Sequence, residues 1–284
     1  MKTSLKQRLP ALVMVGPIVI WLALFIVIPL IYVFAISFMN RGLYSGVVME
    51  FTLDNYIQLL DLEYLNIFWK SILLAVETSV ICLLLGYPFA MIMARADKRM
   101  KPAMMLLIML PFWTNSLIRT YGWNTLLRSE GIINNLLLRL GLIQKPLELL
   151  YTDGAVLLGM VYTLFPFMVL PLYSSIEKLD SSLMEAAGDL GARRVRSFLR
   201  VMLPLTAPGI FAGTIQVFIP TLGYFFISNM MGGGKTMYIG NLIKNQFLSA
   251  RNWPLGAALS ILLILLTLLL MKLYSRVGKM EDMV

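Results

Sequence analysis

The sequence predicts an all-α integral membrane protein with six transmembrane helices. Only 14% of its 284 residues are charged and 59% are hydrophobic, whereas a soluble domain carries roughly 25% charged residues. The chain also contains six apolar runs, each long enough to provide the roughly 20 residues that an α-helix needs to cross a bilayer. Together these observations exclude a soluble globular domain.

The predicted spans are separated by loops that hold most of the charge. The first span lacks a small-residue cleavage site and is too long for the apolar core of a signal peptide, so we expect it to be retained. Pro111 breaks the third span, because proline removes a backbone donor from a helix. The six spans are residues 11–38, 71–94, 102–126, 154–176, 203–229 and 253–274.

The lysines and arginines predict the orientation of the chain. If the N-terminal residues 1–10 are cytoplasmic, then the segments on that side, including the loop 177–202 and the tail 275–284, hold most of the 24 basic residues. The positive-inside rule favours this orientation. Much of the net charge of +9 then faces anionic lipid headgroups, so the bilayer explains the charge and no nucleic acid is needed. The extracytoplasmic loops are residues 39–70, 127–153 and 230–252.

The composition also narrows the chemistry. The chain has no histidine, which removes the commonest metal ligand and general base. Its single cysteine, Cys82, cannot form an intrachain disulfide. We therefore expect this chain to have no catalytic residue and to bind no metal or cofactor, which disfavours a membrane enzyme.

The stretch EAAGDLGARRVRSFLRVMLP, residues 185–204, is a charged insert between the fourth and fifth spans. Asp180 and Ser181 are good N-cap candidates for a helix that begins before it. An apolar face recurs at helical spacing, and Gly191 ends the helix because glycine readily adopts the left-handed conformation. The residues of that face are Leu183, Ala186, Ala187 and Leu190.

A second helix is predicted to follow Gly191 and to lead into the fifth span through Leu203 and Pro204. Four arginines flank its apolar stripe, as in a helix at the membrane interface. A force on the first helix would then move the second and the span joined rigidly to it. An ordinary surface loop with positive-inside arginines is the alternative. The stripe is formed by Val195, Phe198, Leu199 and Met202.

The insert resembles the EAA…G…I-LP signature of permease subunits of ATP-binding-cassette (ABC) importers. Glu185-Ala186-Ala187, Gly191 and Leu203-Pro204 match it in residue and spacing, and Val201 replaces the usual isoleucine. The resemblance implies a type I importer permease fold, with a permease domain at about residues 66–274. It also implies that the first helix is a cytoplasmic coupling helix that docks on an ATPase. The docking residues would be Glu185, Ala186, Ala187, Asp189, Gly191 and Ala192.

Three further stretches resemble the spermidine/putrescine permeases among these importers, of the PotB type rather than the PotC type. They are LLLGYPFA (residues 83–90), LPFWTNSLIRTYGW (residues 110–123) and LPLYSSIEKLD (residues 170–180). Permeases for iron, sulfate or thiamine share parts of this pattern, so the substrate stays open.

The resemblance implies a non-catalytic subunit in the inner (cytoplasmic) membrane of a bacterium, with both termini cytoplasmic. Its expected partners are a dimer of ABC ATPases that uses ATP and Mg²⁺, a second homologous permease that makes a heterodimer, and an extracytoplasmic polyamine-binding protein. A stand-alone secondary transporter is the competing class, and several intramembrane acids or an internal repeat would be typical of it.

A glycine-rich stretch imitates a nucleotide-binding loop. MMGGGKT, residues 230–236, ends as G-K-T, but a phosphate-binding loop needs G-x-x-x-x-G-K-[ST], and Asn229 stands at its first glycine position. We interpret the stretch as a turn. ATP hydrolysis would therefore belong to another polypeptide.

A polycationic substrate favours carboxylates and aromatic faces. Glu77 is the one acid of the second span, where a charge is costly unless it is paired or faces water; a structural ion pair with Lys70 is the alternative. Arg119 would repel a polycation, so we expect it to have a structural or loop-anchoring role. The other pathway candidates are Trp113, Asn115 and Tyr121 after Pro111, together with Tyr173, Tyr224 and Phe225. The glycines and prolines of the fifth span predict close packing or bending.

Overall fold

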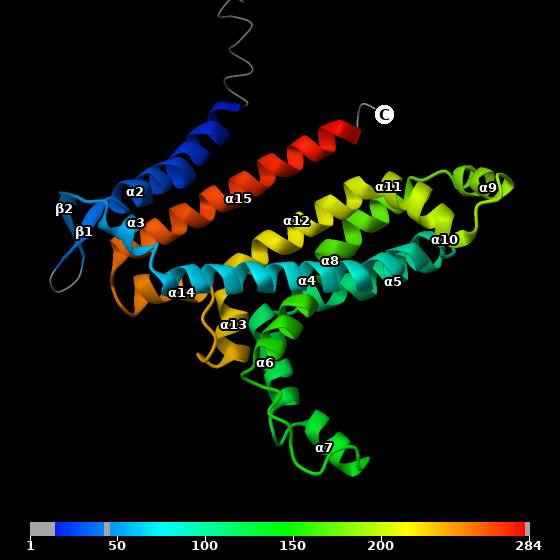
Figure 1. Ribbon diagram of the computed structural model, residues 1–284, viewed down its shortest axis with the longest axis horizontal. Helices are drawn as coiled ribbons and strands as arrows, with labels where there is room; N and C mark the ends of the chain where they lie inside the picture. The colour runs from blue at the N-terminus through cyan, green and yellow to red at the C-terminus, as the bar shows by residue number, and fades with distance from the viewer. Residues whose placement is uncertain (1–14, 43–45, 282–284) are drawn as a thin grey trace, which may run out of the picture. The chain divides into compact units, whose positions relative to one another are not determined.

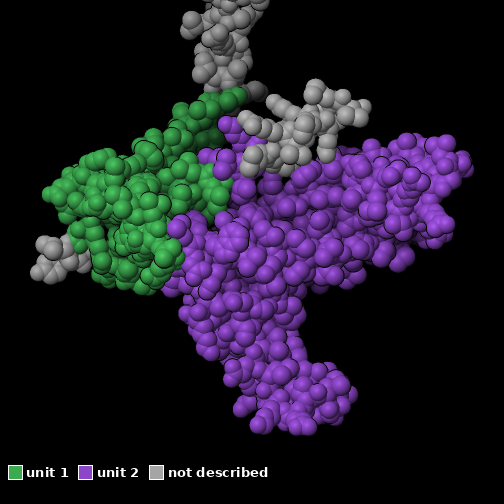
Figure 2. Space-filling view, viewed as in Figure 1, with its two compact units in different colours: residues 1–64, 243–266 green, residues 65–242, 267–284 purple. Residues whose placement is uncertain are grey.

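The structure is a computed structural model that describes residues 15–42 and 46–281. These residues are almost entirely helical and form two compact units, drawn in green and purple in Figure 2. Unit 1 comprises Met1–Tyr64 and Ile243–Leu266, and unit 2 comprises Leu65–Leu242 and Thr267–Val284. Within the described residues, four helices are long and apolar enough to cross a membrane, and six spans result if each of two bent helix pairs counts as one.

Unit 1 begins with the helix Val15–Ile36, which includes a π-helical turn, η1 (Ala23–Val27), and α2 (Ile28–Ile36). Residues 11–14 of the predicted first span lie outside the described residues. The loop after it holds an antiparallel hairpin of β1 (Met39–Arg41) and β2 (Val47–Phe51), seen in Figure 1, which the sequence analysis did not predict. It is followed by α3 (Asp54–Gln58), whose Asn55 donates from Nδ2 to the carbonyls of Ser37 and Met39 at 3.0 and 2.9 Å.

Unit 2 is a helical bundle with α8 (Asp153–Glu177) at its centre. Figure 1 shows α12 (Ala207–Gly223) running alongside α8 and α9 (Ser181–Asp189) at one end of the unit. The remaining elements are α4 (Leu62–Arg95), α5 (Met100–Met109), η2 (Leu110–Trp113), α6 (Ser116–Leu127), α7 (Ile132–Arg139), α10 (Arg194–Ser197), η3 (Phe198–Met202), α11 (Leu203–Leu205), α13 (Phe225–Gly232), α14 (Ile239–Leu248) and α15 (Trp253–Glu281). The ends of α4 and α14 and part of α15 belong to unit 1.

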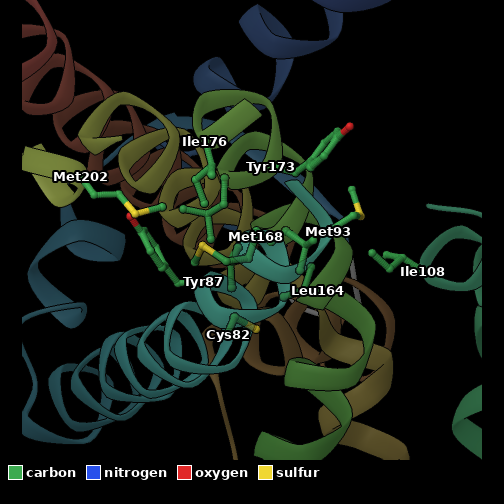
Figure 3. Packing of buried hydrophobic residues seen from close by; sticks show 13 residues of the cluster. Cys82, Tyr87, Met93, Ile108, Leu164, Met168, Tyr173, Ile176 and Met202 are labelled. Atoms are coloured by element: carbon green, nitrogen blue, oxygen red, sulfur yellow. The ribbon is translucent and has the colours of Figure 1, made fainter. Parts of the chain in front are cut away.

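The larger core cluster of unit 2 joins α4, α5, α8, η3 and α12. Leu164, Met168 and Leu172, on one side of α8, are completely buried. Cys82 of α4 is also completely buried, and its thiol lies 3.7 Å from the carbonyl oxygen of Val161. Figure 3 shows Met168 in the middle of these side chains. The packing of α8 against its neighbours therefore fixes the frame on which the functional segments are mounted.

Two glycines bring α12 close to α8. A Cβ atom at Gly209 would lie 2.8 Å from the carbonyl oxygen of Pro171, and one at Gly213 would lie 2.7 Å from the sulfur of Met168. Their spacing is the G-x-x-x-G pattern that lets membrane helices approach closely. The close packing expected of this glycine-rich span is confirmed.

The helix bounds differ from the predicted spans in several places, among them the end of α15, which reaches Glu281 rather than residue 274. Helix α4 begins at Leu62, within the segment assigned to the outer loop. The segment 203–229 is not one helix, because the chain bends by 66° between Arg194–Leu205 and Ala207–Gly223 and breaks again at Tyr224. The first three residues of MMGGGKT are the last residues of α13, and the rest form a turn in which Gly233 has a φ of 59°. A helix rather than a strand therefore precedes the turn.

Candidate functional site

The charged insert after α8 begins with a capped helix. The Asp180 side chain accepts a hydrogen bond from the backbone N–H of Ser182 at 3.0 Å and is the N-cap of α9. The bonds from Ser182 lower the pKa of the Asp180 carboxyl below its usual range. Of the two predicted N-cap candidates, the structure therefore selects Asp180.

Gly191 ends α9 as predicted. Its φ is 79°, in the left-handed region, which a residue with a Cβ reaches only at a cost. The N–H of Gly191 donates to the carbonyl of Gly188 at 2.8 Å, and the N–H of Ala192 donates to that of Ala187 at 3.0 Å. This pair of bonds is the Schellman motif. It brings Ala187, Gly191 and Ala192 of the predicted docking set together in one turn.

Much of the apolar face predicted for α9 is exposed. Leu183 is 44% exposed and Leu190 is 89% exposed, and Ala186 is exposed between them. Met184, on another side, is half-buried and packs against the core cluster. Glu185 and Asp189 are also exposed beside this apolar surface. Contiguous exposed apolar surface rimmed by polar residues is typical of a protein-binding site.

A cavity of about 630 Å³ lies between α9 and the end of α4. Met91 and Arg95 of α4 line one side, and Met184 and Gly188 of α9 line another. Residues of α10 and η3, among them Val195 and Phe198, complete the lining.

Thr206 marks the bend between the insert and α12. Its N–H donates to Met202 O at 3.0 Å and its carbonyl accepts from the N–H of Ile210 at 3.1 Å, so Thr206 keeps a helical hydrogen bond on each side of the bend. Pro208 has no N–H with which to continue the series. The buried Thr206 hydroxyl donates to Met202 O at 2.9 Å and lies 2.8 Å from the hydroxyl of Tyr87 on α4. The second helix was expected to be joined rigidly to the fifth span, and the structure shows that the connection is a bend held by side-chain hydrogen bonds.

Only half of the apolar stripe predicted for the second helix is covered by this chain. Met202 is buried, and Phe198 packs edge to face on Tyr87 at 5.4 Å between ring centroids. Val195 and Leu199 are 70% and 54% exposed. The predicted second helix is also not regular, since α10 changes to the π-helical η3 at Phe198.

A second break separates η2 from α6, where the helix axes turn by 91°. Thr114 and Asn115 are extended, and the Asn115 side chain caps α6 by accepting from the N–H of Leu117 at 2.8 Å. Trp113 is 75% exposed and Tyr121 is 62% exposed. The structure thus brings three predicted pathway residues, Trp113, Asn115 and Tyr121, to one break in the chain.

Glu77 is exposed on α4, on the same side as the exposed residues Leu73, Val80 and Leu84. The alternative of an ion pair with Lys70 is not realised in the described part of the chain. The Glu77 carboxylate interacts electrostatically with Tyr238, whose hydroxyl donates to Asp153 Oδ1 at 2.7 Å. Burial, the bond to Asp153 and the charges of Asp153 and Glu77 raise the pKa of Tyr238.

The remaining pathway candidates lie elsewhere. The Tyr173 hydroxyl donates to Glu177 Oε1 at 2.5 Å, and the same oxygen accepts from Lys101 at 3.0 Å. In Figure 3 this hydroxyl points away from the other labelled side chains. Tyr224 forms the break between α12 and α13 and packs at 5.5 Å on Phe226, while Phe225 is 42% exposed. Tyr173 is therefore apart from the break at Asn115.

Two interactions were missed at the level of sequence. The hydrogen bond between Tyr87 and Thr206 joins residues far apart in the chain, and no motif marks it. Arg119 lies over the ring of Phe112, with 4.8 Å from the guanidinium carbon to the ring centroid. In the sequence, only the position of Arg119 shortly after the break at Pro111 indicated a contact of this kind.

Comparison with known proteins places these features in a family context. Residues 83–279 match the model of the family described as "Binding-protein-dependent transport system inner membrane component". The chain is 47% identical over 267 residues to the spermidine/putrescine transport system permease protein PotB of Escherichia coli (strain K12), which covers 94% of this chain and 97% of that protein. It is 45% identical over 260 residues to the PotB protein of Haemophilus influenzae (strain ATCC 51907 / DSM 11121 / KW20 / Rd), with 92% of this chain and 91% of that protein covered.

The chain is also similar to a solved structure. A crystal structure of a bacterial alginate ABC transporter, in complex with an alginate pentasaccharide-bound periplasmic protein, contains a chain that superposes with a TM-score of 0.74. The superposition covers 95% of this chain and 93% of that chain at 18% sequence identity. At this identity the likeness concerns the fold.

Proposed function

Because the chain belongs to the family of binding-protein-dependent transport system inner membrane components, we propose that it is the permease subunit of an ATP-driven importer of polyamines. The protein is a non-catalytic membrane component with the type I importer permease fold. In the proposed importer it forms half of a translocation pathway for spermidine or putrescine delivered by an extracytoplasmic binding protein.

The observation that carries the substrate class is the similarity to the PotB relatives, at 45–47% identity over more than nine-tenths of the chain. Those relatives are named for spermidine and putrescine. The exposed carboxylate of Glu77 and the exposed rings of Trp113, Tyr121 and Phe225 are chemically suited to a flexible polycation. The alginate transporter shares the fold and gives no support for any substrate.

The exposed face of α9 supports the proposed docking of an ATPase subunit. Leu183, Ala186 and Leu190 would enter a groove of that subunit, with Glu185 and Asp189 beside them. The remaining predicted docking residues, Ala187, Gly191 and Ala192, would shape the turn that presents this face. ATP and Mg²⁺ would be bound by the ATPase alone.

The bend at Thr206 supplies a route for the coupling movement. ATP would close the paired ATPases and displace α9, and the hydrogen bonds that Thr206 makes to the turn on each side of the bend would carry that displacement to α12. The pathway would then open toward the docked binding protein, and hydrolysis would return it to face the cytoplasm. This scheme places both termini and α9 on the cytoplasmic side, and a second, homologous permease completes the pathway.

ATP hydrolysis by the purified complex in lipid tests this function. The complex would contain this chain, the second permease and the ATPase, with the binding protein added empty or loaded with spermidine, putrescine or sulfate. Stimulation only by a polyamine-loaded protein is the expected result. Stimulation by a binding protein loaded with another ligand would support the importer function and would exclude polyamines as its substrates. A chain that never assembles with an ATPase would instead be consistent with a secondary transporter.

The docking face is tested separately with Glu185→Lys. We expect this variant to insert normally and to lose transport, because it reverses a charge beside the exposed face of α9. Glu63→Lys is the matched control, since Glu63 is also exposed and lies in the first turn of α4. Equal transport by both variants would contradict the docking role of α9.

A further inference from the structure

Arg119 is held against aromatic rings. It lies on α6 just after the break, with its guanidinium carbon 4.8 Å from the centroid of the Phe112 ring and 6.0 Å from that of the Tyr162 ring. Trp123, one turn further along α6, packs edge to face on Tyr162 at 5.4 Å. These three rings come from η2, α8 and α6.

Part of the Arg119 guanidinium is buried without hydrogen-bond acceptors. Its Nε and Nη1 atoms are buried and have no hydrogen-bond partner among the described residues. Burying charged donors without acceptors is unfavourable, so the ring faces provide the main compensation through cation–π attraction. The arrangement suits a cation, but it serves guanidinium poorly because guanidinium carries five N–H donors.

An apolar cavity of about 510 Å³ adjoins these rings. Phe112 and Tyr162 belong to its wall, together with Pro111, Phe89 and Phe165. Such a lining fits the methylene segment of an alkylamine, and the rings beside it fit the ammonium group at the end of that segment.

We propose that Phe112 and Tyr162, with Trp123 packed against Tyr162 beside them, form a binding site for an alkylammonium group, which the protein's own Arg119 fills in this conformation. The identity of the ligand as a polyamine rests on the proposed function. Two cations repel at this distance, so the ammonium group and the guanidinium exclude one another. The free energies of the two states are close to equal. The ammonium group gains the contacts with the ring faces, and Arg119 regains hydrogen-bond partners outside the site.

A carboxylate from a second permease is the other group that Arg119 would attract. It does not account for the geometry equally well, because a carboxylate that paired with Nη2 from outside would leave the buried Nε and Nη1 still without partners. Displacement by a small cation requires only that the Arg119 side chain move. An intersubunit ion pair is therefore treated as an outcome that overturns the proposal.

Quenching of Trp123 fluorescence by spermidine tests the site directly. The importer complex would be placed in lipid nanodiscs without the binding protein. Since the chain has five tryptophans, the signal of Trp123 is taken as the difference from a Trp123→Phe variant. Arg119→Gln should lower the spermidine concentration for half-maximal quenching by about fivefold or more, which corresponds to one cation–π contact.

Three further variants make the result decisive. Phe112→Leu in the Arg119→Gln background should reverse the gain, and Arg119→Lys should retain the weak response of the unmodified protein. Phe51→Leu should leave the response unchanged, because Phe51 stacks on Phe38 at 5.7 Å and does not line the cavity. Quenching that is unchanged or weakened by Arg119→Gln would overturn the proposal. Loss of the second permease from the Arg119→Gln complex would also overturn it, because it would indicate an intersubunit ion pair of Arg119. ATP hydrolysis that depends on a polyamine-loaded binding protein reports on the proposed function independently of this signal.

Discussion

The two breaks of the bundle differ in how the backbone passes through them. At Thr114 and Asn115 the chain becomes extended, and α6 starts anew with its own side-chain cap and a change of direction of 91°. At Thr206 the chain bends by 66° while the hydrogen bonds on both sides continue. Thr206 is hydrogen-bonded to the helical turn on each side of its bend, which favours transmission of a displacement from one arm to the other. The extended residues Thr114 and Asn115 favour independent movement of the two arms at their break.

The side chains around the two breaks also differ, in how deeply they are buried and how tightly they are packed. Thr206 is completely buried and bonded to Tyr87, and α12 beyond it is held to α8 by two glycines. The break at Asn115 leaves Trp113 and Tyr121 exposed, and Gly122 on α6 has open space around it. The first arrangement is suited to transmission and the second to local rearrangement.

The largest effect is expected where α12 meets α8. In Gly209→Ala the new Cβ atom would lie 2.5 Å from Ser175 Cβ and 2.8 Å from Pro171 O, so the helices must separate. Overpacking of this kind costs about 1–3 kcal/mol, and thermal unfolding in detergent should show it as a lower Tm. Gly122→Ala at the other break meets no atom within 4 Å and should leave Tm unchanged or slightly higher. Equal Tm values for the two variants would show that α12 and α8 are not packed more tightly at Gly209 than α6 is at Gly122.

Tyr87→Phe should have the next largest effect. It removes the hydroxyl that lies 2.8 Å from Thr206 Oγ1, at a cost of about 1 kcal/mol for one hydrogen bond. Because that bond fixes the bend, we expect less substrate to be transported per ATP hydrolysed, measured with both rates in the same vesicles. Tyr121→Phe, at the exposed break, is the control. An unchanged ratio in Tyr87→Phe would show that the bend does not depend on this bond.

Asn115→Ala should act locally. The variant removes the cap of α6 and leaves the N–H of Leu117 without its acceptor. Exposed caps contribute roughly 0.5–1 kcal/mol, so amide hydrogen exchange should accelerate in the first turn of α6 and stay constant around Thr206. Asn115→Asp keeps an acceptor and should restore protection. Faster exchange at Thr206 as well would mean that the two breaks are coupled.

The smallest effect is expected from acidification. Asp180 caps α9 as Asn115 caps α6, but only Asp180 titrates, and its pKa in the folded protein is lowered. Its contribution is therefore present above the pKa of the unfolded chain and is lost as the pH falls through the lowered folded-state value. Hydrogen exchange at the start of α9 should accelerate slightly in that acidic range, while the start of α6 should not respond. Asp180→Asn should abolish the pH dependence.

The sequence was informative where local chemistry decides the structure. The cap at Asp180, the turn at Gly191 and the close approach at Gly209 and Gly213 each depend on a residue type at a fixed spacing, and each was visible before the structure. The bend at Thr206, the bond to Tyr87 and the aromatic surroundings of Arg119 depend on pairings between distant segments, which no periodicity encodes.

The exposed apolar faces show a second limit. Periodicity predicted the stripes on α9 and on the helix after it, yet Val195 and Leu199 are exposed in the single chain. A hydrophobic pattern reports that a face will be covered and does not identify the covering chain. The roles proposed for Glu77, for the docking residues of α9 and for the pathway aromatics accordingly stay predictions.

The complete burial of Cys82 has a practical consequence for measurement. It is the protein's single thiol, and a buried structural cysteine reacts slowly with labelling reagents. A cysteine introduced at exposed Leu190 and another at exposed Trp113 would therefore accept a pair of spin labels or fluorophores against the natural background. Distances recorded during turnover would then follow the two breaks of the chain in the working transporter.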